Sequence, residues 1–195
     1  MSGVDLFGGV TTVDTGDRNA FDYYPTPAWM TRSLLHFHQS ISGSKVLEPC
    51  SGDGAIVRVL EEVGCTVLTN DIDPRHPAQS HHDATDPAYW SSLPYVEWVI
   101  TNPPFNVAFP ILQLATTVAQ VGVALLLRKT FLEPTEERGP WLSEHPPARQ
   151  IGQPRHSFRG KGSDSVSCDW CIWLRHPGTW YVPIEIDHVA ERRTR

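Results

Sequence analysis

The sequence lacks a long apolar run: no stretch approaches the ~20 consecutive apolar residues that a helix needs to cross a bilayer. Its first residues also lack the basic-then-apolar pattern of a secretion signal. Cysteine is scarce, with four residues among 195, as suits reduced thiols in the cytosol. We therefore predict a cytoplasmic protein that has no membrane partner.

Positive charge is in the minority, since 16 Lys and Arg residues stand against 22 Asp and Glu residues and the net charge is -6. The protein as a whole does not attract a polyanion, so any contact with nucleic acid has to be local. Clustered metal ligands are also missing. Cys168 and Cys171 have the C-x-x-C spacing, but structural zinc sites need four ligands and no second pair accompanies them. We predict no metal site.

A strand, a glycine-rich turn and a helix follow one another early in the chain. Lys45–Glu48 forms the strand, Pro49–Gly54 the turn, and the apolar residues from Ala55 to about Val63 the helix. This order is typical of a Rossmann-type unit, in which glycines let the backbone approach a nucleotide-like ligand. The G-x-G-x-x-G fingerprint and the lysine-containing phosphate loop are both absent, which favours a ligand without phosphate.

A carboxylate follows the second predicted strand, Cys65–Asn70. Asp71 lies roughly 20 residues after Glu48, the spacing at which such units place an acid that binds ribose hydroxyls. We therefore predict that Asp71, with Ile72 beside it, holds ribose. The third strand is poorly defined, because polar residues occupy positions 79–82 where an apolar run is expected.

Strands and helices alternate along the rest of the chain, which indicates a parallel, doubly wound sheet. Thr26 is expected to cap a helix that begins at Pro27. Further helices are predicted at 86–92, 109–120 and 135–143, and further strands at 96–101, 121–127 and 165–174, with a short one at 181–186. The 165–174 strand is expected to form an antiparallel edge pair with the chain around Ile151.

The apolar run before Asn102 ends abruptly on Asn102-Pro103-Pro104-Phe105. Prolines cannot donate to a ladder, so the chain leaves the sheet there, at the carboxyl end of a strand. The Asn102 side-chain carbonyl and the Pro103 backbone carbonyl can both accept hydrogen bonds from a planar amine, and Phe105 offers a stacking face. The stretch is therefore suited to holding a planar amino group.

Basic residues concentrate in 149–161, which contains no acid. Basic side chains interleaved with an aromatic in a glycine-containing loop can bind phosphates and stack on a base, although such a stretch can also be a solvated hairpin tip. The candidate substrate-binding residues are Arg149, Arg155, Phe158, Arg159 and Lys161.

Five features match, in order, the motifs of methyltransferases that use S-adenosylmethionine. Tyr24–Pro27 resembles motif X, Glu48–Gly54 motif I, His82–Asp86 motif III and Asn102–Phe105 motif IV, while Asp71 has the place of the ribose acid. Over roughly residues 21–175 the chain is similar to class I S-adenosylmethionine-dependent methyltransferases of the N6-adenine DNA type. The opening D-Y-Y-P-T-P and the stretch R-x-x-F-L-E-P resemble small phage or prophage adenine methyltransferases.

The resemblance implies an α/β, Rossmann-like methyltransferase fold, with a seven-stranded, mainly parallel sheet and an antiparallel edge hairpin. It implies a single methyltransferase domain over 21–195, in which 133–165 is the candidate substrate-recognition segment. Residues 1–20 are rich in Gly, Thr and Asp without periodicity, and we predict a flexible N-terminus there. The catalytic residues would be Asn102, Pro103, Pro104 and Phe105. S-adenosylmethionine would be held by Tyr24, Thr26, Pro27, Glu48, Pro49, Gly52, Gly54, Asp71, Ile72 and Asp83.

We therefore expect methyl transfer to the N6 amino group of adenine in DNA. One alternative is an RNA methyltransferase acting on adenine or guanine amines. Another is a protein-glutamine methyltransferase, although these most often carry Tyr where this chain has Phe105. A catalytically idle nucleic-acid-binding module is the non-enzyme alternative, and failure to bind S-adenosylmethionine would favour it.

Overall fold

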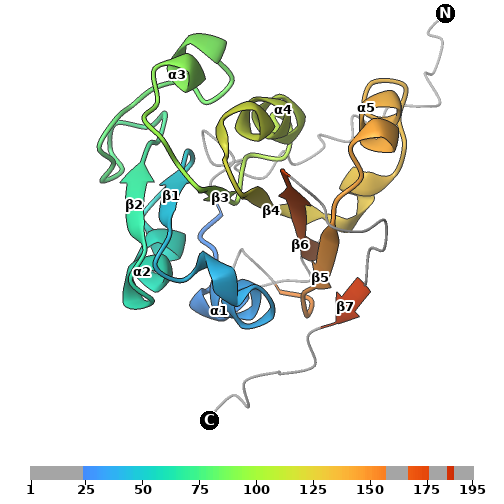
Figure 1. Ribbon diagram of the computed structural model, residues 1–195, viewed down its shortest axis with the longest axis horizontal. Coiled ribbons are helices and arrows are strands. Elements are labelled where there is room, and N and C mark those ends of the chain that lie inside the picture. Colours follow the sequence, from blue (N-terminus) through green and yellow to red (C-terminus); the bar gives the residue numbers. More distant parts are fainter. Residues whose placement is uncertain (1–23, 157–166, 176–183, 187–195) are drawn as a thin grey trace, which may run out of the picture.

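The computed structural model describes residues 24–156, 167–175 and 184–186. Seven strands form one sheet in the order β2-β1-β3-β4-β6-β5-β7, and helices cover both of its faces (Figure 1). The strands are β1 (Lys45–Glu48), β2 (Thr66–Thr69), β3 (Trp98–Thr101), β4 (Gly122–Arg128), β5 (Arg149–Gly152), β6 (Cys168–Leu174) and β7 (Ile184–Ile186). The helices are α1 (Ala28–Phe37), α2 (Ala55–Glu62), α3 (Pro87–Ser91), α4 (Ala108–Val118) and α5 (Gly139–Glu144), with short 3-10 turns η1 (Gln39–Ile41) and η2 (Lys129–Leu132).

The first four strands of the sheet, β2, β1, β3 and β4, run parallel to one another. β6 is antiparallel to both of its neighbours, β4 and β5, so the predicted mainly parallel sheet with an antiparallel pair is confirmed. The pair does not form the outer edge, however, because β7 adds itself to β5 in parallel. β7 lies within the range in which the sequence predicts a short final strand.

The third predicted strand is reduced to one isolated bridge, between Asn70 and Ser80. In place of a ladder of backbone hydrogen bonds, the fully buried side chain of Asn70 connects this polar segment to the sheet. Its amide nitrogen donates to the carbonyls of Pro49 and His82, and its oxygen accepts from the Ser80 hydroxyl and the His82 backbone N–H. The polar sequence at 79–82 is thus satisfied by side-chain hydrogen bonds.

Side chains alternate between two cores, one on each face of the sheet. On β3, Trp98 and Ile100 pack with α1 and α2, whereas Val99 packs with α3 and α4 (Figure 1). The same alternation separates Cys168 from Cys171, which are buried on opposite faces of β6. These two thiols therefore cannot bind a common metal ion from their places in the strand.

The start of α1 differs from its prediction. The helix begins at Ala28, after Pro27, and no side chain caps its first turn. The expectation that Thr26 caps this helix is wrong, because the Thr26 hydroxyl accepts a hydrogen bond from Asn102 instead. The predicted helix at 135–143 is also shorter and later than expected, since α5 covers Gly139–Glu144.

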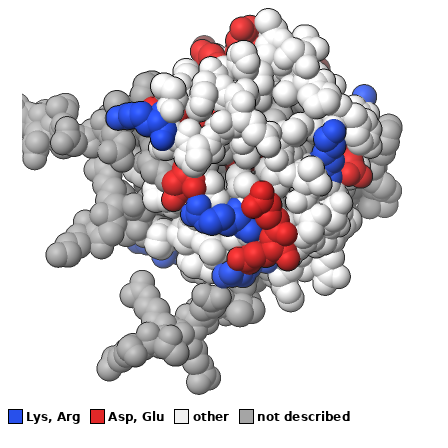
Figure 2. All heavy atoms as spheres, turned by 90° about the vertical axis from the view of Figure 1, so that its left-hand side faces the viewer, with Lys and Arg blue, Asp and Glu red and all other residues white. Residues whose placement is uncertain are grey.

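The face that Figure 2 shows carries basic side chains next to acidic ones, with no large area of one sign. Among the described residues, arginines pair with carboxylates at Arg32–Glu62, Arg58–Asp53 and Arg75–Asp73. No helix in the described part of the chain is long and apolar enough to cross a membrane.

Candidate active site

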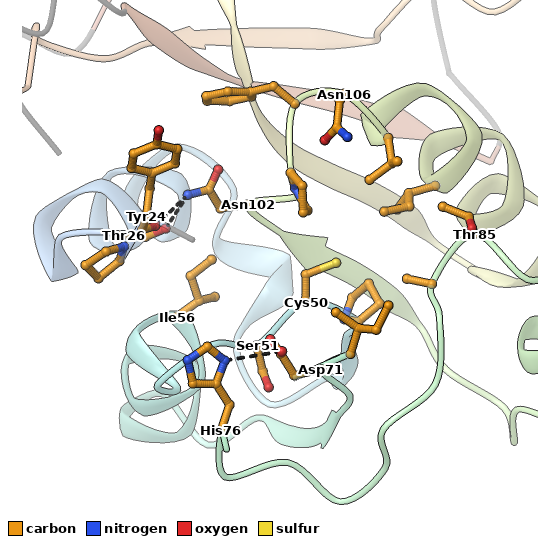
Figure 3. Close-up of a pocket in the computed structure, with 18 of the residues that line it drawn as sticks. Tyr24, Thr26, Cys50, Ser51, Ile56, Asp71, His76, Thr85, Asn102 and Asn106 are labelled. Atoms are coloured by element: carbon orange, nitrogen blue, oxygen red, sulfur yellow. Dashed lines mark hydrogen bonds and ion pairs between the residues drawn. The ribbon is translucent and has the colours of Figure 1, made fainter. Parts of the chain in front are cut away.

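The carboxyl ends of β1, β2, β3 and β4 meet at one edge of the sheet, where β1 lies between β2 and β3. Strand order reverses at this point, and open α/β sheets bind their ligands at such reversals. A cavity of about 840 Å³ opens here (Figure 3). The predicted site residues that line it are Tyr24, Thr26, Pro49, Asp71, Ile72, Asp83, Asn102, Pro104 and Phe105. The structure thus brings together residues that lie far apart in the sequence.

Other predicted site residues do not line the cavity. Among the candidate cofactor-binding and catalytic residues these are Pro27, Glu48, Gly52, Gly54 and Pro103. Arg149 and Arg155, candidates for substrate binding, also lie elsewhere, while Phe158, Arg159 and Lys161 fall outside the described residues.

Asn102 follows the last residue of β3, and two acceptors hold its side-chain nitrogen. Nδ2 donates to the backbone carbonyl of Tyr24 at 3.1 Å and to the Thr26 hydroxyl at 3.0 Å (Figure 3). A backbone carbonyl can only accept, so the nitrogen of the amide, and not its oxygen, points to Tyr24. Among the described residues, Asn102 Oδ1 accepts no hydrogen bond. This oxygen is therefore available to a donor in the cavity.

Phe105 contacts two other residues that line the cavity, Tyr24 and Arg128. The Tyr24 ring is stacked with it at 6.3 Å between centroids and 23° between planes. The guanidinium carbon of Arg128 lies 4.2 Å from the Phe105 centroid, over the ring. Stacked rings and a cation over an aromatic face stabilise such an arrangement by about 0.5–1.5 kcal/mol each.

The turn between β1 and α2 is linked to the carboxylate of Asp71. Gly52 and Gly54 have φ angles of 53° and 80°, which side chains rarely adopt, so glycine is favoured at both positions. The Gly52 backbone N–H donates to Asp71 Oδ2 at 2.7 Å. The two glycines therefore shape the wall of the cavity and position the predicted ribose acid without lining the cavity themselves.

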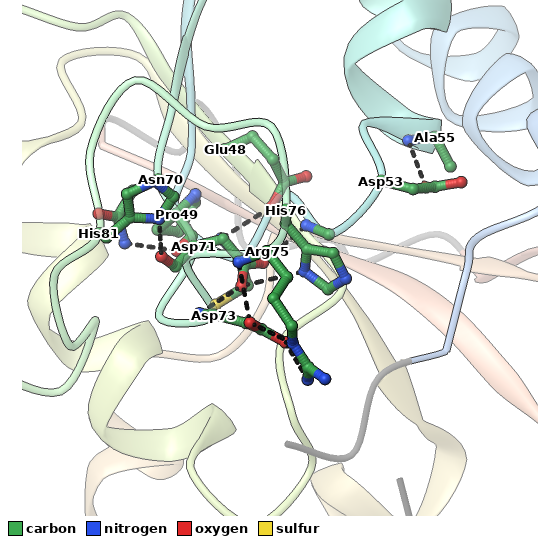
Figure 4. A network of polar contacts seen from close by, with 12 residues as sticks. Glu48, Pro49, Asp53, Ala55, Asn70, Asp71, Asp73, Arg75, His76 and His81 are labelled. Carbon is green, nitrogen blue, oxygen red and sulfur yellow. Dashed lines mark hydrogen bonds and ion pairs between the residues drawn. The ribbon is translucent and has the colours of Figure 1, made fainter. Parts of the chain in front are cut away.

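Asp71 Oδ1 has two further partners in the polar network of Figure 4. It accepts from the Asp73 backbone N–H at 2.9 Å and lies 3.2 Å from Nδ1 of His76. Asp73 in turn binds the Arg75 side chain, whose hydrogen bonds lower the pKa of the Asp73 carboxyl to about 2. A carboxylate offers about four acceptor positions, so Oδ2, which accepts from Gly52, retains one.

Glu48 lies behind the turn and is fully buried. Burial raises the pKa of its carboxyl to about 8, against the lowering effect of the nearby Thr101 hydroxyl and of the Cys50 backbone N–H. Glu48 is therefore protonated at neutral pH and supports the turn through Cys50 N–H, which donates to its Oε1 at 3.2 Å. Burial, followed by the nearby Glu48 and Asp71 carboxyls, raises the pKa of the Cys50 thiol well above its ordinary value. The raised pKa favours the thiol form over the thiolate.

Arg149 has a role at the far end of the sheet. It is the first residue of β5, and its guanidinium donates to the carbonyl of Phe37, the last residue of α1. The contact joins the end of α1 to the sheet, away from the carboxyl ends of the parallel strands.

Sequence reasoning named no single site residue in a group that lines the cavity at and after the end of β4, although Arg138 lies within the predicted recognition segment 133–165. These are Arg128, Thr130, Phe131 and Arg138. The available signal was that Arg128 directly follows the apolar run 121–127, just as Asn102 follows the run in β3. Both residues therefore emerge at the same edge of the sheet.

No protein-family model and no curated protein sequence matches this chain. Solved structures do match it in fold. A type I restriction-modification methyltransferase subunit from Streptococcus thermophilus aligns with a TM-score of 0.60 and 14% identity, over 78% of this chain. The chain spans 44% of the length of that subunit.

Two further matches are of more similar size. A putative RNA methyltransferase from Pyrococcus horikoshii aligns with a TM-score of 0.58 and 14% identity, over 79% of this chain and 87% of its own. Magnesium protoporphyrin IX methyltransferase from Synechocystis PCC 6803, solved with bound S-adenosylmethionine, aligns with a TM-score of 0.55 and 14% identity, over 76% and 79% of the two chains. The chain therefore has the Rossmann-like methyltransferase fold.

Proposed function

We propose that this protein transfers a methyl group from S-adenosylmethionine to the N6 amino group of adenine in DNA. The observation that carries the proposal is the orientation of Asn102. Its amide nitrogen is held by Tyr24 and Thr26, and its oxygen remains for a donor. An acceptor fixed in this way at the cavity suits an amine substrate, and the fold is one that methyltransferases share.

The cavity suits S-adenosylmethionine in size and in chemistry. Its volume of about 840 Å³ lies within the ~300–1,000 Å³ of ligand sites. Asp71 would accept from the ribose through Oδ2, and Asp83, which lines the same cavity, would accept from the adenine amine of the cofactor. Neither role needs a phosphate-binding loop, in agreement with the turn sequence. When bound, S-adenosylmethionine supplies an electrophilic methyl group on its sulfonium.

Asn102 would prepare the target nitrogen. The N6 lone pair of adenine is delocalised into its ring, which makes the nitrogen a weak nucleophile. A hydrogen bond from one of its N–H groups to Asn102 Oδ1 would favour a tetrahedral nitrogen whose lone pair is free to attack. The Pro103 carbonyl, predicted as a second acceptor, belongs to a residue that does not line the cavity. The nitrogen–methyl bond forms as the carbon–sulfur bond breaks, and one N6 proton is then released to water. No protein nucleophile takes part.

The target base would have to leave the duplex to reach Asn102. Phe105 would stack on the extruded adenine, and Tyr24 lies close enough to support it from the same side of the cavity. Sequence recognition would rest on the segment 133–165, of which Arg149–Gly152 is already part of the sheet as β5.

Transfer of a labelled methyl group from S-adenosylmethionine to duplex DNA, single-stranded DNA, RNA and protein, measured in parallel, tests the proposal. We expect N6-methyladenine in DNA after nucleoside analysis. Label in RNA or on glutamine would reassign the substrate to one of the alternatives. Failure to bind S-adenosylmethionine would favour the non-enzymatic binding module.

A further inference from the structure

Two arginines that line the cavity each lie over an aromatic ring; one is the last residue of β4 and the other comes later in the chain. Arg128 lies over the Phe105 ring, with its guanidinium carbon 4.2 Å from the centroid. Arg138 lies over Phe131, which is buried, at 5.0 Å. All four residues line the cavity together with Asn102. Two positive charges are thus held against aromatic rings in the same cavity as the residue proposed to bind the target amine.

Neither guanidinium is neutralised within the described part of the chain. Arg32, Arg58 and Arg75 each pair with a carboxylate, but no described carboxylate lies within 4.0 Å of Arg128 or Arg138. These two positive charges are available to bind an anion. The net charge of -6 of the whole protein would otherwise repel an anionic partner.

Arg138 also has a donor without an acceptor. Its Nε is buried and has no hydrogen-bond partner, and its Nη2 reaches only the Glu133 carbonyl, at 3.5 Å. A buried charged donor left unpaired is destabilising. A negative charge placed beside this guanidinium from the cavity would stabilise it. Guanidinium groups match phosphate geometry and form two parallel hydrogen bonds to it.

We propose that Arg128 and Arg138 bind backbone phosphates of DNA on either side of the target nucleotide. The proposal rests on the proposed function, since Arg128 contacts Phe105, the residue proposed to stack on the adenine, and would therefore lie near that nucleotide. The two arginines supply the local positive charge that the composition lacks. Phosphate contacts of this kind position the substrate and carry no sequence information.

The salt dependence of DNA binding measures these contacts. The logarithm of the binding constant falls with the logarithm of salt concentration, with a slope of about 0.9 per phosphate neutralised in duplex DNA. We expect Arg128→Gln and Arg138→Gln each to reduce this slope by about 0.9, measured by fluorescence anisotropy with an adenine-containing duplex. Arg128→Lys should keep the slope, because it keeps the charge. Arg32→Gln, on the surface of α1, is the matched control and should change nothing.

Measuring S-adenosylmethionine binding by the same variants distinguishes phosphate contacts from contacts with the cofactor. The expected result is unchanged cofactor affinity. Weaker cofactor binding with an unchanged salt slope would mean that the arginines hold the cofactor carboxylate, and the proposal would be overturned. If the protein methylates DNA but neither Gln variant changes the salt slope of DNA binding, the phosphate contacts are refuted and the proposed function stands. Reduced slopes in a protein that methylates no DNA would support the contacts and refute only the proposed function.

Discussion

Replacement of Thr26 by valine removes one of the two acceptors that orient the Asn102 amide, while the size of the side chain hardly changes. Thr26 is only 5% exposed, so water does not readily replace its hydroxyl. A donor left unpaired in such a place costs about 1–3 kcal/mol. The lost hydrogen bond weakens the orientation of the Asn102 amide, on which binding of the target amine depends. We therefore expect kcat to fall by about 5- to 150-fold.

Methyl transfer to DNA and calorimetric binding of S-adenosylmethionine, measured on the same preparation, test this expectation. Thr26→Val should leave the cofactor Kd unchanged, because the hydroxyl is engaged with Asn102. Thr26→Ser retains the hydroxyl and should restore most of the activity. The reasoning is refuted if the valine variant binds the cofactor more weakly and turns over normally, since Thr26 would then contact the cofactor, as its motif resemblance implies.

Two predictions concern stability. The pKa of Glu48 is raised to about 8 in the folded protein, so the folded state binds the extra proton and the free energy of unfolding decreases as pH rises from about 5 to about 8, by up to ~1.4 kcal/mol per pH unit. Urea unfolding of Glu48→Gln should show a weaker decrease, and an identical decrease in both proteins would contradict the assignment. A Cβ at Gly122 would lie 2.5 Å from Trp98 Cζ3 and 2.8 Å from the Trp173 carbonyl, so Gly122→Ala should lower the stability by about 1–3 kcal/mol or more. Thermal unfolding checks this against Gly139→Ala, where the added carbon meets only ordinary contacts, and equal Tm values would count against the packing described.

Local sequence patterns were sufficient to predict much of the fold. Apolar runs at 96–101 and 121–127 became β3 and β4, because buried parallel strands need side chains that suit both faces. The polar residues at 79–82 correctly indicated a weak third strand. The pattern could not show that Asn70 would satisfy this segment through its side chain, since that depends on contacts between distant residues.

The candidate site was predictable where residues follow the ends of strands, as Asp71 and Asn102 do. It was not predictable where a side chain acts through a tertiary contact. Thr26 has the sequence position of a helix cap, but Asn102 takes its hydroxyl. Arg149 belongs to a basic stretch, yet it binds the end of α1. Nothing in the sequence around Arg128 indicates that its side chain lies over the Phe105 ring, because Phe105 belongs to another loop.

The most direct test of the account is the activity of purified Asn102→Ala, measured as N6-methyladenine formed in DNA alongside cofactor binding. The account predicts no detectable product and an unchanged Kd for S-adenosylmethionine, because Asn102 acts on the target amine. Thr117→Ala, on the exposed side of α4, should remain active and controls for the preparation. Product formed by Asn102→Ala at a rate close to that of the natural protein would contradict the central role of this amide.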